Sequence, residues 1–559
     1  MSGPGDARLE RWLQATVVVL VLIQVLFWRN MMDADGMSYL DVAHAYAEGD
    51  WAGAVNGYWS PLYSWLLTAL IVIFDLSPRQ EIAVTHALSF VLFLLALAAF
   101  SFFLHQLLAR TSVAEERTEP ASNRAWLALA YAALAYACIS LTHVGRGGPD
   151  LLLAASFYAA MGLMLRFARA STREIPTGLL LGAVMGLGYL AKAAMFPVAV
   201  LVLVCLGVLT RRAKRGTLGL ALAILAFGGI SAPWIATLSH AKGRWTYGDT
   251  GKLNYFWYVN DGAQGDPAYG RMLHPPRELS RSPVVYEFAE PVRGTYPLWY
   301  DPSYWYEGVR TRFDIRAQIR RLSLSTEDYF NQFWFFPCVL AVAALGLIAG
   351  RSAVRNGVAS TWFVIVPAAA GLAMYALVLV LPRHLAPFFA VGLTALGLGI
   401  GKQLDSGAYD RRRSAHMLAA TLAILLTVMT LAQLLFIDRR LPPGHPHLDV
   451  ATQLQKHGLT PGSRVGVIGD AMHASWAHIA SLKIVAEIGP NETIAFWAQD
   501  SARRASQLEL FRSAGAVAIV ADHVPPWAEK SGWVSMGKND YVLHLFTEMP
   551  RGELLETIQ

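Results

Sequence analysis

The sequence is divided into long apolar runs that alternate with short polar segments. A helix that crosses the hydrocarbon core of a bilayer needs roughly 20 apolar residues. Of the 559 residues, 55% are hydrophobic and only 15% are charged, and the mean hydropathy is +0.38, which is unlike a soluble globular protein. The pattern predicts about eleven transmembrane helices, at residues 12–28, 82–105, 125–143, 150–166, 177–192, 194–210, 217–239, 335–350, 358–381, 385–401 and 415–437.

The basic residues predict how these helices are oriented. Clusters of Lys and Arg occur in every second connection, and the positive-inside rule assigns such short clusters to the cytoplasm together with the N-terminus. The first run follows Arg8 and Arg11, but it has no small-residue cleavage site, so we interpret it as a retained span and not as a signal peptide. The clusters lie within 110–124, 166–173, 211–215, 351–355 and 402–413.

The segment Pro61–Phe74 is apolar but short. Counting it as a crossing would move every later basic cluster to the outer side, so we expect it to lie in or dip into the outer interface. This topology gives two larger outer loops, 29–81 and 240–334. The second is rich in Arg, but a loop of about 95 residues translocates regardless of its charge.

The C-terminal part has a different composition. Residues 464–469, 516–521 and 541–546 are typical of strands, and 502–513 of a helix. The predicted fold is therefore a polytopic all-α membrane bundle, residues 1–437, with a small soluble α/β domain, residues 438–559, on the outer side.

Acidic residues follow the first run on the outer side. Asp33, Asp35 and Asp41 accompany Tyr39 in a segment with helical spacing of apolar residues, and we expect Asp35 just before an interfacial helix. Such a carboxylate can act as a general base towards a hydroxyl, or it can cap the helix, which is the commoner role at such positions. Asp150 offers the same alternatives at the start of the run 150–166.

Several cations are expected on the same face. Lys192 stands between two nearly continuous apolar runs, where it either snorkels to the interface or binds an anionic headgroup. Arg383 and His384 stand in another outer turn. Arg146 can pair with Asp150 or bind a phosphate in bidentate fashion. Two cations from distant parts of the chain could together neutralise a phosphate leaving group.

The loop 240–334 carries two aromatic clusters, 245–258 and 299–306, and a basic helical face at Arg312, Arg316 and Arg320. The rings can anchor the loop at the level of the lipid headgroups, which we favour, or stack on sugars. For the basic face we expect contact with the headgroups of membrane lipids, and the alternative is a merely solvated face.

Other functions find little support in the sequence. The net charge of +6 is explained by orientation in the bilayer, so no nucleic acid is expected. Cys138, Cys205 and Cys338 form no disulfide framework or metal motif. The Gly466-x-x-Gly469 turn lacks the third glycine of a dinucleotide fingerprint. The histidines show no metal-ligand spacing. No cofactor is predicted with certainty, and a divalent metal is left open.

Taken in order, the outer-face residues resemble the GT-C superfamily of polytopic glycosyltransferases, in particular the bacterial branch of lipid A aminoarabinose transferases and protein O-mannosyltransferase-like enzymes. The resemblance covers roughly residues 12–401. It is carried by Asp-x-x-x-Tyr at Asp35 to Tyr39, by Ser60 to Tyr63 in place of Pro-Pro-Leu-Tyr, by Arg-x-x-Pro-Asp at Arg146 to Asp150, by a span ending in Lys192, and by Arg-x-x-x-Pro at Arg383 to Pro387.

The resemblance implies transfer of a sugar from a polyprenyl-phosphate donor to a hydroxyl of a glycan, lipid or protein, with inversion. It places the protein in the bacterial cytoplasmic (inner) membrane, with the active site and the C-terminal domain in the periplasm. It implies that Asp35 is the base, that Asp150 positions the acceptor or the base, and that Lys192 and Arg383, with Arg146, bind the donor phosphate. Further candidate substrate contacts are Asp33, Tyr39, Tyr63 and His384.

The chain departs from the family pattern at two places. Gly36 stands where many members have Glu after the first Asp, and His384 stands where they have Tyr. The alternative to an enzyme is a lipid or sugar transporter or flippase, which would show ionisable residues near span centres, broken helices or repeated halves. A membrane scaffold whose outer domain binds a partner is a third interpretation.

Overall fold

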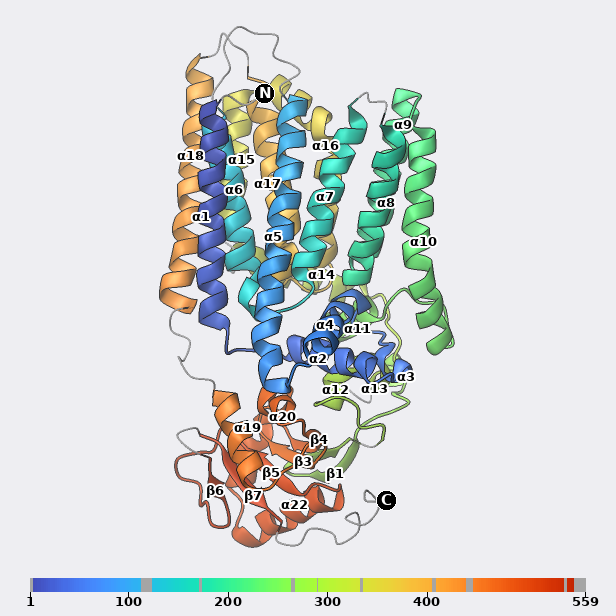
Figure 1. The fold of residues 1–559 in the computed structure, drawn as a ribbon, viewed down its shortest axis with the longest axis vertical. Coiled ribbons are helices and arrows are strands. Elements are labelled where there is room, and N and C mark those ends of the chain that lie inside the picture. The colour runs from blue at the N-terminus through green and yellow to red at the C-terminus, as the bar shows by residue number, and fades with distance from the viewer. Residues whose placement is uncertain are drawn as a thin grey trace.

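The computed structural model describes residues 4–111, 123–169, 173–262, 267–288, 290–331, 335–404, 409–438, 446–536 and 540–546. Within these residues ten helices are long and apolar enough to cross a membrane, and they stand side by side in one bundle (Figure 1). The chain is thus a multi-pass membrane protein. The ten helices are α1 (Pro4–Trp28), α5 (Pro78–Thr111), α6 (Arg124–Tyr136, continued by η2, Ala137–Thr142), α7 (Asp150–Ala168), α8 (Glu174–Ala191), α9 (Met195–Ala213), α10 (Thr217–Ala241), α16 (Arg351–Ala376), α17 (Pro382–Gly401) and α18 (Tyr409–Ala432, continued by η5, Gln433–Ile437).

The lengths of three apolar helices bear on how the chain crosses the membrane. The run predicted at 335–350 forms α15 (Phe335–Ala349), which has only 15 residues. The run predicted at 358–381 is helical only to Ala376, and the chain beyond it leaves the helix. Helix α4 (Pro61–Phe74) has 14 residues, about 21 Å at 1.5 Å per residue, and it lies with other short helices at the end of the bundle opposite the N-terminus (Figure 1).

Small residues allow the closest helix packing in the bundle. Gly178 and Gly182 lie on the face of α8 that meets α10, and a Cβ atom at either position would stand 2.1 Å from a backbone oxygen of Gly219 or Ala223. Because lipid tails are as apolar as the side chains, close backbone approach through small residues is a main source of helix association in membranes.

The short helices of the loop 29–81 lie at the end of the bundle opposite the N-terminus (Figure 1). They are α2 (Ala34–Ala47), α3 (Trp51–Ala54) and α4. Ser64 and Thr68 of α4 donate hydrogen bonds to the carbonyl oxygens of Tyr39 and Ala43 at 3.0 and 3.1 Å. These bonds hold α2 against α4 and fix the orientation of the helix that carries Asp35.

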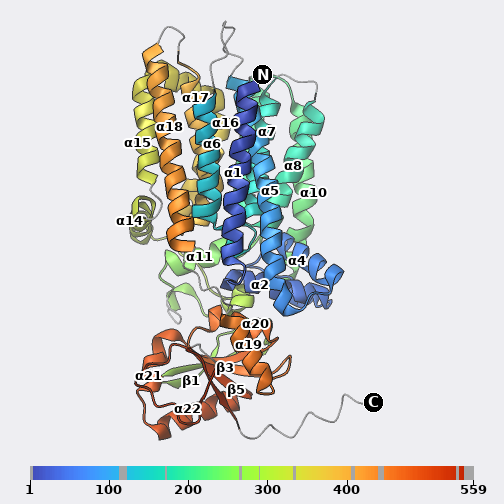
Figure 2. The same ribbon diagram turned by 60° about the vertical axis from the view of Figure 1, so that its left-hand side comes forward.

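The C-terminal region forms the sheet domain beyond these helices (Figure 2). The seven strands have the order β1-β2-β4-β3-β5-β7-β6, and β3 runs parallel to both β4 and β5. The elements are α19 (Pro446–Lys456), β3 (Arg464–Ile468), α20 (Ser475–Ile479), β4 (Lys483–Ile488), α21 (Thr493–Trp497), α22 (Ser501–Ser513), β5 (Ala518–Ala521), β6 (Val534–Ser535) and β7 (Val542–Leu545). The predicted strands correspond to β3, β5 and β7, and the predicted helix to α22.

The remaining two strands come from the long loop 240–334. The hairpin β1 (Arg277–Arg281) and β2 (Val284–Glu287) extends the sheet, with Tyr286 opposite Glu487 of β4. The loop also forms α11 (Thr250–Tyr258), α12 (Pro297–Tyr300), α13 (Pro302–Trp305) and α14 (Ile315–Asn331). It therefore connects the bundle physically to the C-terminal domain.

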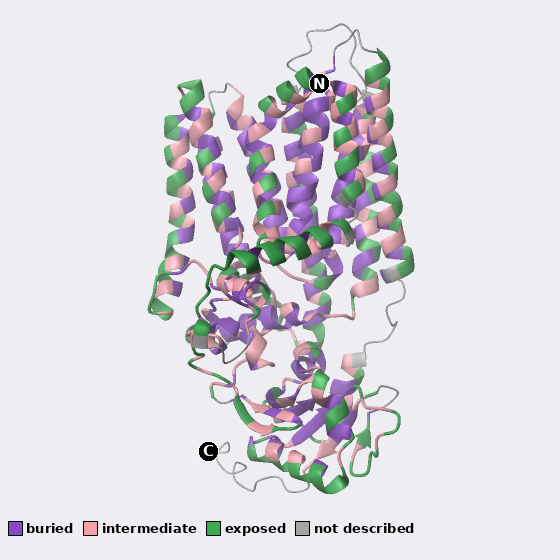
Figure 3. Cartoon of the chain, turned by 180° about the vertical axis from the view of Figure 1, so that it is seen from behind, coloured by how far each residue is buried: buried purple, intermediate pink, exposed green. Residues whose placement is uncertain are grey.

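The distribution of buried and exposed residues is that expected of a helix bundle in a membrane. The inner faces of the bundle helices and the sheet are buried, whereas many outward-facing residues of the bundle are exposed (Figure 3). Helix α14 lies across the bundle with exposed apolar residues such as Ile315 and Ile319, which are 59% and 60% exposed. Its predicted basic face is exposed at Arg316 and Arg320, and Arg320 pairs with Asp261.

Candidate active site

The start of helix α2 determines which acid faces the interior. Asp33 is the N-cap residue, and its carboxylate accepts a hydrogen bond from the backbone N–H of Gly36 at 2.8 Å. The helix begins at Ala34, so the expectation that Asp35 precedes the helix is wrong. Because Asp33 satisfies the orphan N–H, the carboxylate of Asp35 is available for other contacts.

A cavity of about 440 Å³ lies where α2, the long loop and the ends of α8, α16 and α17 meet. Three smaller pockets among the described residues have volumes of only about 10–20 Å³. Six of the residues predicted from sequence line it: Asp35, Tyr39, Asp150, Lys192, Arg383 and His384. The fold thus brings these six residues together from four separate segments of the chain.

The first ion pair of the cavity joins α17 to α2. Arg383 Nη2 donates a hydrogen bond to Asp35 Oδ2 at 2.5 Å, and Nη1 lies 3.6 Å from Asp33 Oδ2. The indole N–H of Trp299 donates to the other oxygen of Asp35 at 3.1 Å. Asp35 is therefore held by two donors, and its side chain is 20% exposed.

The second ion pair joins α8 to α7. Lys192 ends α8 with an extended backbone, φ −155° and ψ 125°, and its Nζ lies 2.5 Å from Asp150 Oδ1. Lys192 thus has a specific ion-pair partner, and both residues line the cavity. Asp150 is the first residue of α7, and the N-cap position before it is Pro149, which makes no side-chain capping bond.

Other predicted residues lie around the cavity and do not line it. Arg146 lines a smaller pocket that shares Asp150 and Arg383 with the cavity, and its guanidinium lies 5.8 Å from the ring centroid of Trp28. Tyr63 is fully buried behind Tyr39, with the two rings edge to face at 5.2 Å. Asp33 touches the site through its contact with Arg383.

His384 forms part of the cavity wall. Its ring stacks on that of Tyr375 with centroids 4.7 Å apart. The buried Nδ1 atom has no hydrogen-bond partner among the described residues. A buried nitrogen in this state is a candidate contact for a substrate hydroxyl or phosphate oxygen.

Burial changes the acid–base properties of the residues on α2. Burial, with the neighbouring charge of Asp35, raises the pKa of Asp33 to about 6, although Arg383 and Arg146 act in the opposite direction. Burial, together with Asp35 and Asp150, raises the pKa of Tyr39 above its usual value. Tyr39 is thus a neutral phenol at physiological pH.

The walls of the cavity are of two kinds. Aromatic rings cover one side, where Tyr58 and Trp299 have centroids 5.5 Å apart. Apolar residues cover another, and they include Met374 in the last turn of α16 and Val378 and Leu379 beyond its end. Sequence reasoning missed this second wall because it treated 358–381 as one continuous helix. It noted the aromatic clusters, but nothing in the sequence separates the rings that face the cavity from those that do not.

One group of residues has the geometry to hold a metal ion. Among the described residues, His44, Glu81 and His478 are the set of His, Cys, Asp or Glu whose ligand atoms lie within 4.8 Å of one another. They do not line the cavity. Sequence reasoning missed them because no two are close enough in sequence to form a motif.

Comparison with solved structures identifies the fold. The crystal structure of ArnT from Cupriavidus metallidurans bound to undecaprenyl phosphate matches with a TM-score of 0.51 and 15% identity, over 95% of this chain and 97% of that chain. The apo structure of the same protein matches with a TM-score of 0.48, 15% identity and the same coverage. The archaeal oligosaccharyltransferase AglB from Archaeoglobus fulgidus, in complex with an inhibitory peptide and a dolichol-phosphate, matches with a TM-score of 0.48 and 13% identity, over 91% and 69% of the two chains.

No family model matches the sequence, and no curated protein matches it either. The structural likeness nevertheless extends along nearly the whole chain. The protein shares its fold with the first ArnT structure: a polytopic helical bundle followed by a C-terminal sheet domain.

Proposed function

We propose that the protein is a glycosyltransferase that moves a sugar from a polyprenyl-phosphate donor to a hydroxyl acceptor. The observation that carries the proposal is the meeting of two carboxylate–cation pairs, Asp35 with Arg383 and Asp150 with Lys192, in one cavity at the end of a membrane bundle. Carboxylates supply a base for a hydroxyl, and the cations supply charge for a phosphate leaving group.

The donor phosphate binds to Lys192 and Arg383. Without substrate each cation is held by a carboxylate, and phosphate oxygens can replace those partners because Arg binds carboxylates and phosphates in the same forked geometry. The apolar wall formed by Val378, Leu379 and Met374 accepts the first isoprene units. The ArnT structure with this fold was solved with undecaprenyl phosphate bound, which supports a donor of this class.

The reaction follows from the charges in the cavity. Asp35 accepts the proton of the acceptor hydroxyl, whose oxygen forms a bond to the anomeric carbon. The bond from that carbon to the phosphate oxygen breaks, and its electron pair leaves on polyprenyl phosphate. Lys192 and Arg383 stabilise the negative charge that develops there. A single displacement of this kind inverts the anomeric configuration, and Asp150 positions the acceptor.

Asp35 can become available as a base when the donor phosphate binds to Arg383. In the cavity its carboxylate is bound by Arg383 and Trp299. When a phosphate competes for Arg383, one oxygen of Asp35 becomes free to accept a proton. Donor binding thereby prepares the base, and no acceptor is deprotonated before the donor arrives.

The distribution of basic residues along the bundle supports an outer location for this cavity. The basic connections lie at the end with the N-terminus, and the cavity lies at the end with the sheet domain (Figure 1). By the positive-inside rule the second end is the outer one. We therefore place the reaction at the periplasmic face of a bacterial inner membrane, where donors of this class need no nucleotide.

Sugar transfer by purified protein in proteoliposomes tests the proposal. With a panel of undecaprenyl-phosphate sugars as donors and lipid A or glycan acceptors, Asp35→Asn should keep its fold but lose at least about 100-fold in rate. Asp500→Asn is the matched control, because it changes an exposed N-cap of α22 to a residue that caps equally well. Retained turnover by Asp35→Asn would exclude this mechanism.

A second measurement tests the donor site separately from the acceptor. Undecaprenyl phosphate alone should bind the wild-type protein in detergent. The Lys192→Ala and Arg383→Ala variants should bind it at least about 10-fold more weakly, since each lost charge-assisted contact is worth about 1.5–3 kcal/mol. Equal affinity of all three proteins would show that the phosphate binds elsewhere.

A further inference from the structure

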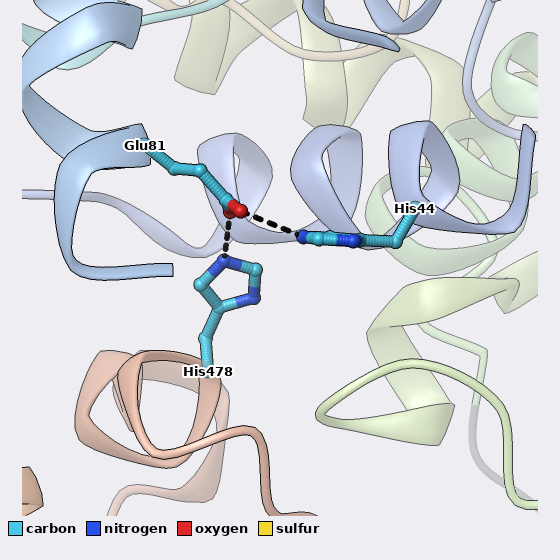
Figure 4. A group of neighbouring side chains, drawn as sticks. All are labelled: His44, Glu81 and His478. Carbon is cyan, nitrogen blue, oxygen red and sulfur yellow. Dashed lines mark hydrogen bonds and ion pairs between the residues drawn. The ribbon is translucent and has the colours of Figure 1, made fainter. Parts of the chain in front are cut away.

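Two histidines and a glutamate from three distant segments meet at the junction of the bundle and the sheet domain. His44 belongs to α2, Glu81 to the first turn of α5, and His478 to α20. The Glu81 carboxylate lies between the two imidazole rings (Figure 4). Its Oε1 is 2.9 Å from His44 Nε2, and its Oε2 is 2.9 Å from His478 Nε2.

The cluster is well enclosed. The side chains of Glu81 and His478 are 0% and 4% exposed, whereas that of His44 is 30% exposed. Two of the three ligands are therefore shielded from water, and the third reaches the surface. This arrangement gives a fixed site with a path by which an ion can enter.

A further carboxylate orients His478 from its other side. Asp41 Oδ1 lies 2.9 Å from His478 Nδ1, and Asp41 is itself fixed by the backbone N–H and the hydroxyl of Thr295 at 2.7 and 2.9 Å. An Nδ1–H that donates to Asp41 leaves the lone pair of Nε2 directed at Glu81. Metal-binding histidines almost always have such a carboxylate or carbonyl partner.

Two carboxylates, those of Asp41 and Glu81, contact the ring of His478 at its two nitrogen atoms. Either two protons on the imidazoles or one divalent ion balances their charge. Both alternatives balance the charge, and metal analysis of the purified protein distinguishes them.

We propose that His44 Nε2, the Glu81 carboxylate and His478 Nε2 bind a divalent transition metal ion, with zinc as the best fit. Two imidazoles and one carboxylate are a common zinc ligand set. Bonds of about 2.0–2.2 Å at tetrahedral angles place ligand atoms about 3.3 Å apart, close to the separations in the cluster. Water occupies the fourth position on the exposed side of His44.

The ion has a structural role and not a catalytic one. It joins α2 to α5 and to the C-terminal domain, three segments that otherwise meet through side-chain packing and hydrogen bonds. His44 is nine residues after Asp35 on α2, about 13 Å along the helix axis. The ion is therefore too far from the cavity to touch the reacting groups, but it fixes the helix that presents Asp35.

Metal analysis of the purified full-length protein tests the site independently of sugar transfer. Protein purified without a histidine tag should contain about one zinc ion per chain. Removal by a chelator should lower the melting temperature, and added Zn²⁺ should restore it, because an ion that binds only the folded state stabilises it. Protein depleted of zinc should bind Co²⁺ and show the visible absorption of a four-coordinate ion.

Variants distinguish loss of the metal site from general effects of substitution. His44→Ala should lower zinc affinity at least 100-fold, and Asp41→Asn, which keeps all three ligands, should lower it 10- to 100-fold. His457→Ala, an exposed histidine at the end of α19, is the control and should bind zinc as the wild type does. Wild-type protein that neither contains zinc nor binds Zn²⁺ or Co²⁺ at 1:1 stoichiometry would overturn the proposal in favour of protonated imidazoles. Equal loss in His457→Ala would overturn it as well.

Discussion

The guanidinium of Arg383 donates a 2.5 Å hydrogen bond to the carboxylate of Asp35, although 348 positions separate the two residues in the chain. The bond joins the start of α17 to the first turn of α2 and closes one side of the cavity. Because Nη1 of the same guanidinium faces Asp33, one cation balances two carboxylates. Its substitution should therefore affect both donor binding and the position of the base.

Arg383→Lys separates charge from geometry. A lysine keeps the positive charge but cannot form forked bonds, so we expect a donor KM at least 10-fold higher and a lower kcat, with a nearly unchanged melting temperature. Arg383→Ala should in addition lower the free energy of unfolding by about 3 kcal/mol, because it leaves a partly buried carboxylate without its partner. Steady-state kinetics and thermal unfolding in detergent measure the two effects. Wild-type kinetics in Arg383→Lys would show that the forked contact is not used.

Lys192→Ala should change donor use more than acceptor use. The ammonium of Lys192 is held by Asp150 in the absence of substrate, and we expect its loss to raise the donor KM at least 10-fold and to leave the acceptor KM within a factor of about two. Lys530→Ala, which removes an exposed lysine of the C-terminal domain, is the matched control. An equal effect on donor and acceptor would contradict the assignment of Lys192 to the donor phosphate.

Gly178→Val should destabilise the bundle. A Cβ at position 178 would stand 2.1 Å from the carbonyl oxygen of Gly219, so α8 and α10 must move apart, at a cost of about 1–3 kcal/mol. Gly228→Ala is the contrasting control, since a Cβ there meets no atom within 4 Å and alanine favours the helix by about 1 kcal/mol. We expect opposite shifts of the melting temperature. A stable Gly178→Val protein would show that the two helices do not pack through this glycine.

The bundle could be predicted from the sequence because the bilayer fixes the length of each span. The run predicted at 385–401 is α17, Pro382–Gly401. The alternation of basic clusters predicts that the short segment Pro61–Phe74 does not cross the membrane. The error at 358–381 has a physical cause. Residues 378–381 are as apolar as the helix before them, so hydropathy alone cannot show that the helix ends at Ala376 and that the next residues line the cavity.

The pairings between segments could not be predicted. Lys192 has no acid near it in sequence, and its partner Asp150 becomes visible only when α7 and α8 pack together. The strand β2 pairs with β4 across about 200 residues, so no local pattern reveals that the long loop completes the sheet. The same applies to His44, Glu81 and His478, each unremarkable in its own segment.

The stability of the sheet domain should depend on pH through Glu487. Burial, with the charge of Asp470, raises the pKa of this carboxyl to about 7, although its hydrogen bond from Tyr296 at 3.1 Å acts in the opposite direction. The folded state therefore binds a proton that the unfolded state has already lost between pH of about 4.5 and about 7. Since stability falls with rising pH wherever the folded state binds more protons, this group should lower the free energy of unfolding by up to roughly 3 kcal/mol across that window. Glu487→Gln removes the titration and keeps a hydrogen-bonding amide. We expect its melting temperature to fall less than that of the wild type between pH 5 and pH 7.5, whereas Glu509→Gln, at an exposed position of α22, should follow the wild type. Parallel curves for the wild type and Glu487→Gln would show that this carboxyl is ionised throughout the range.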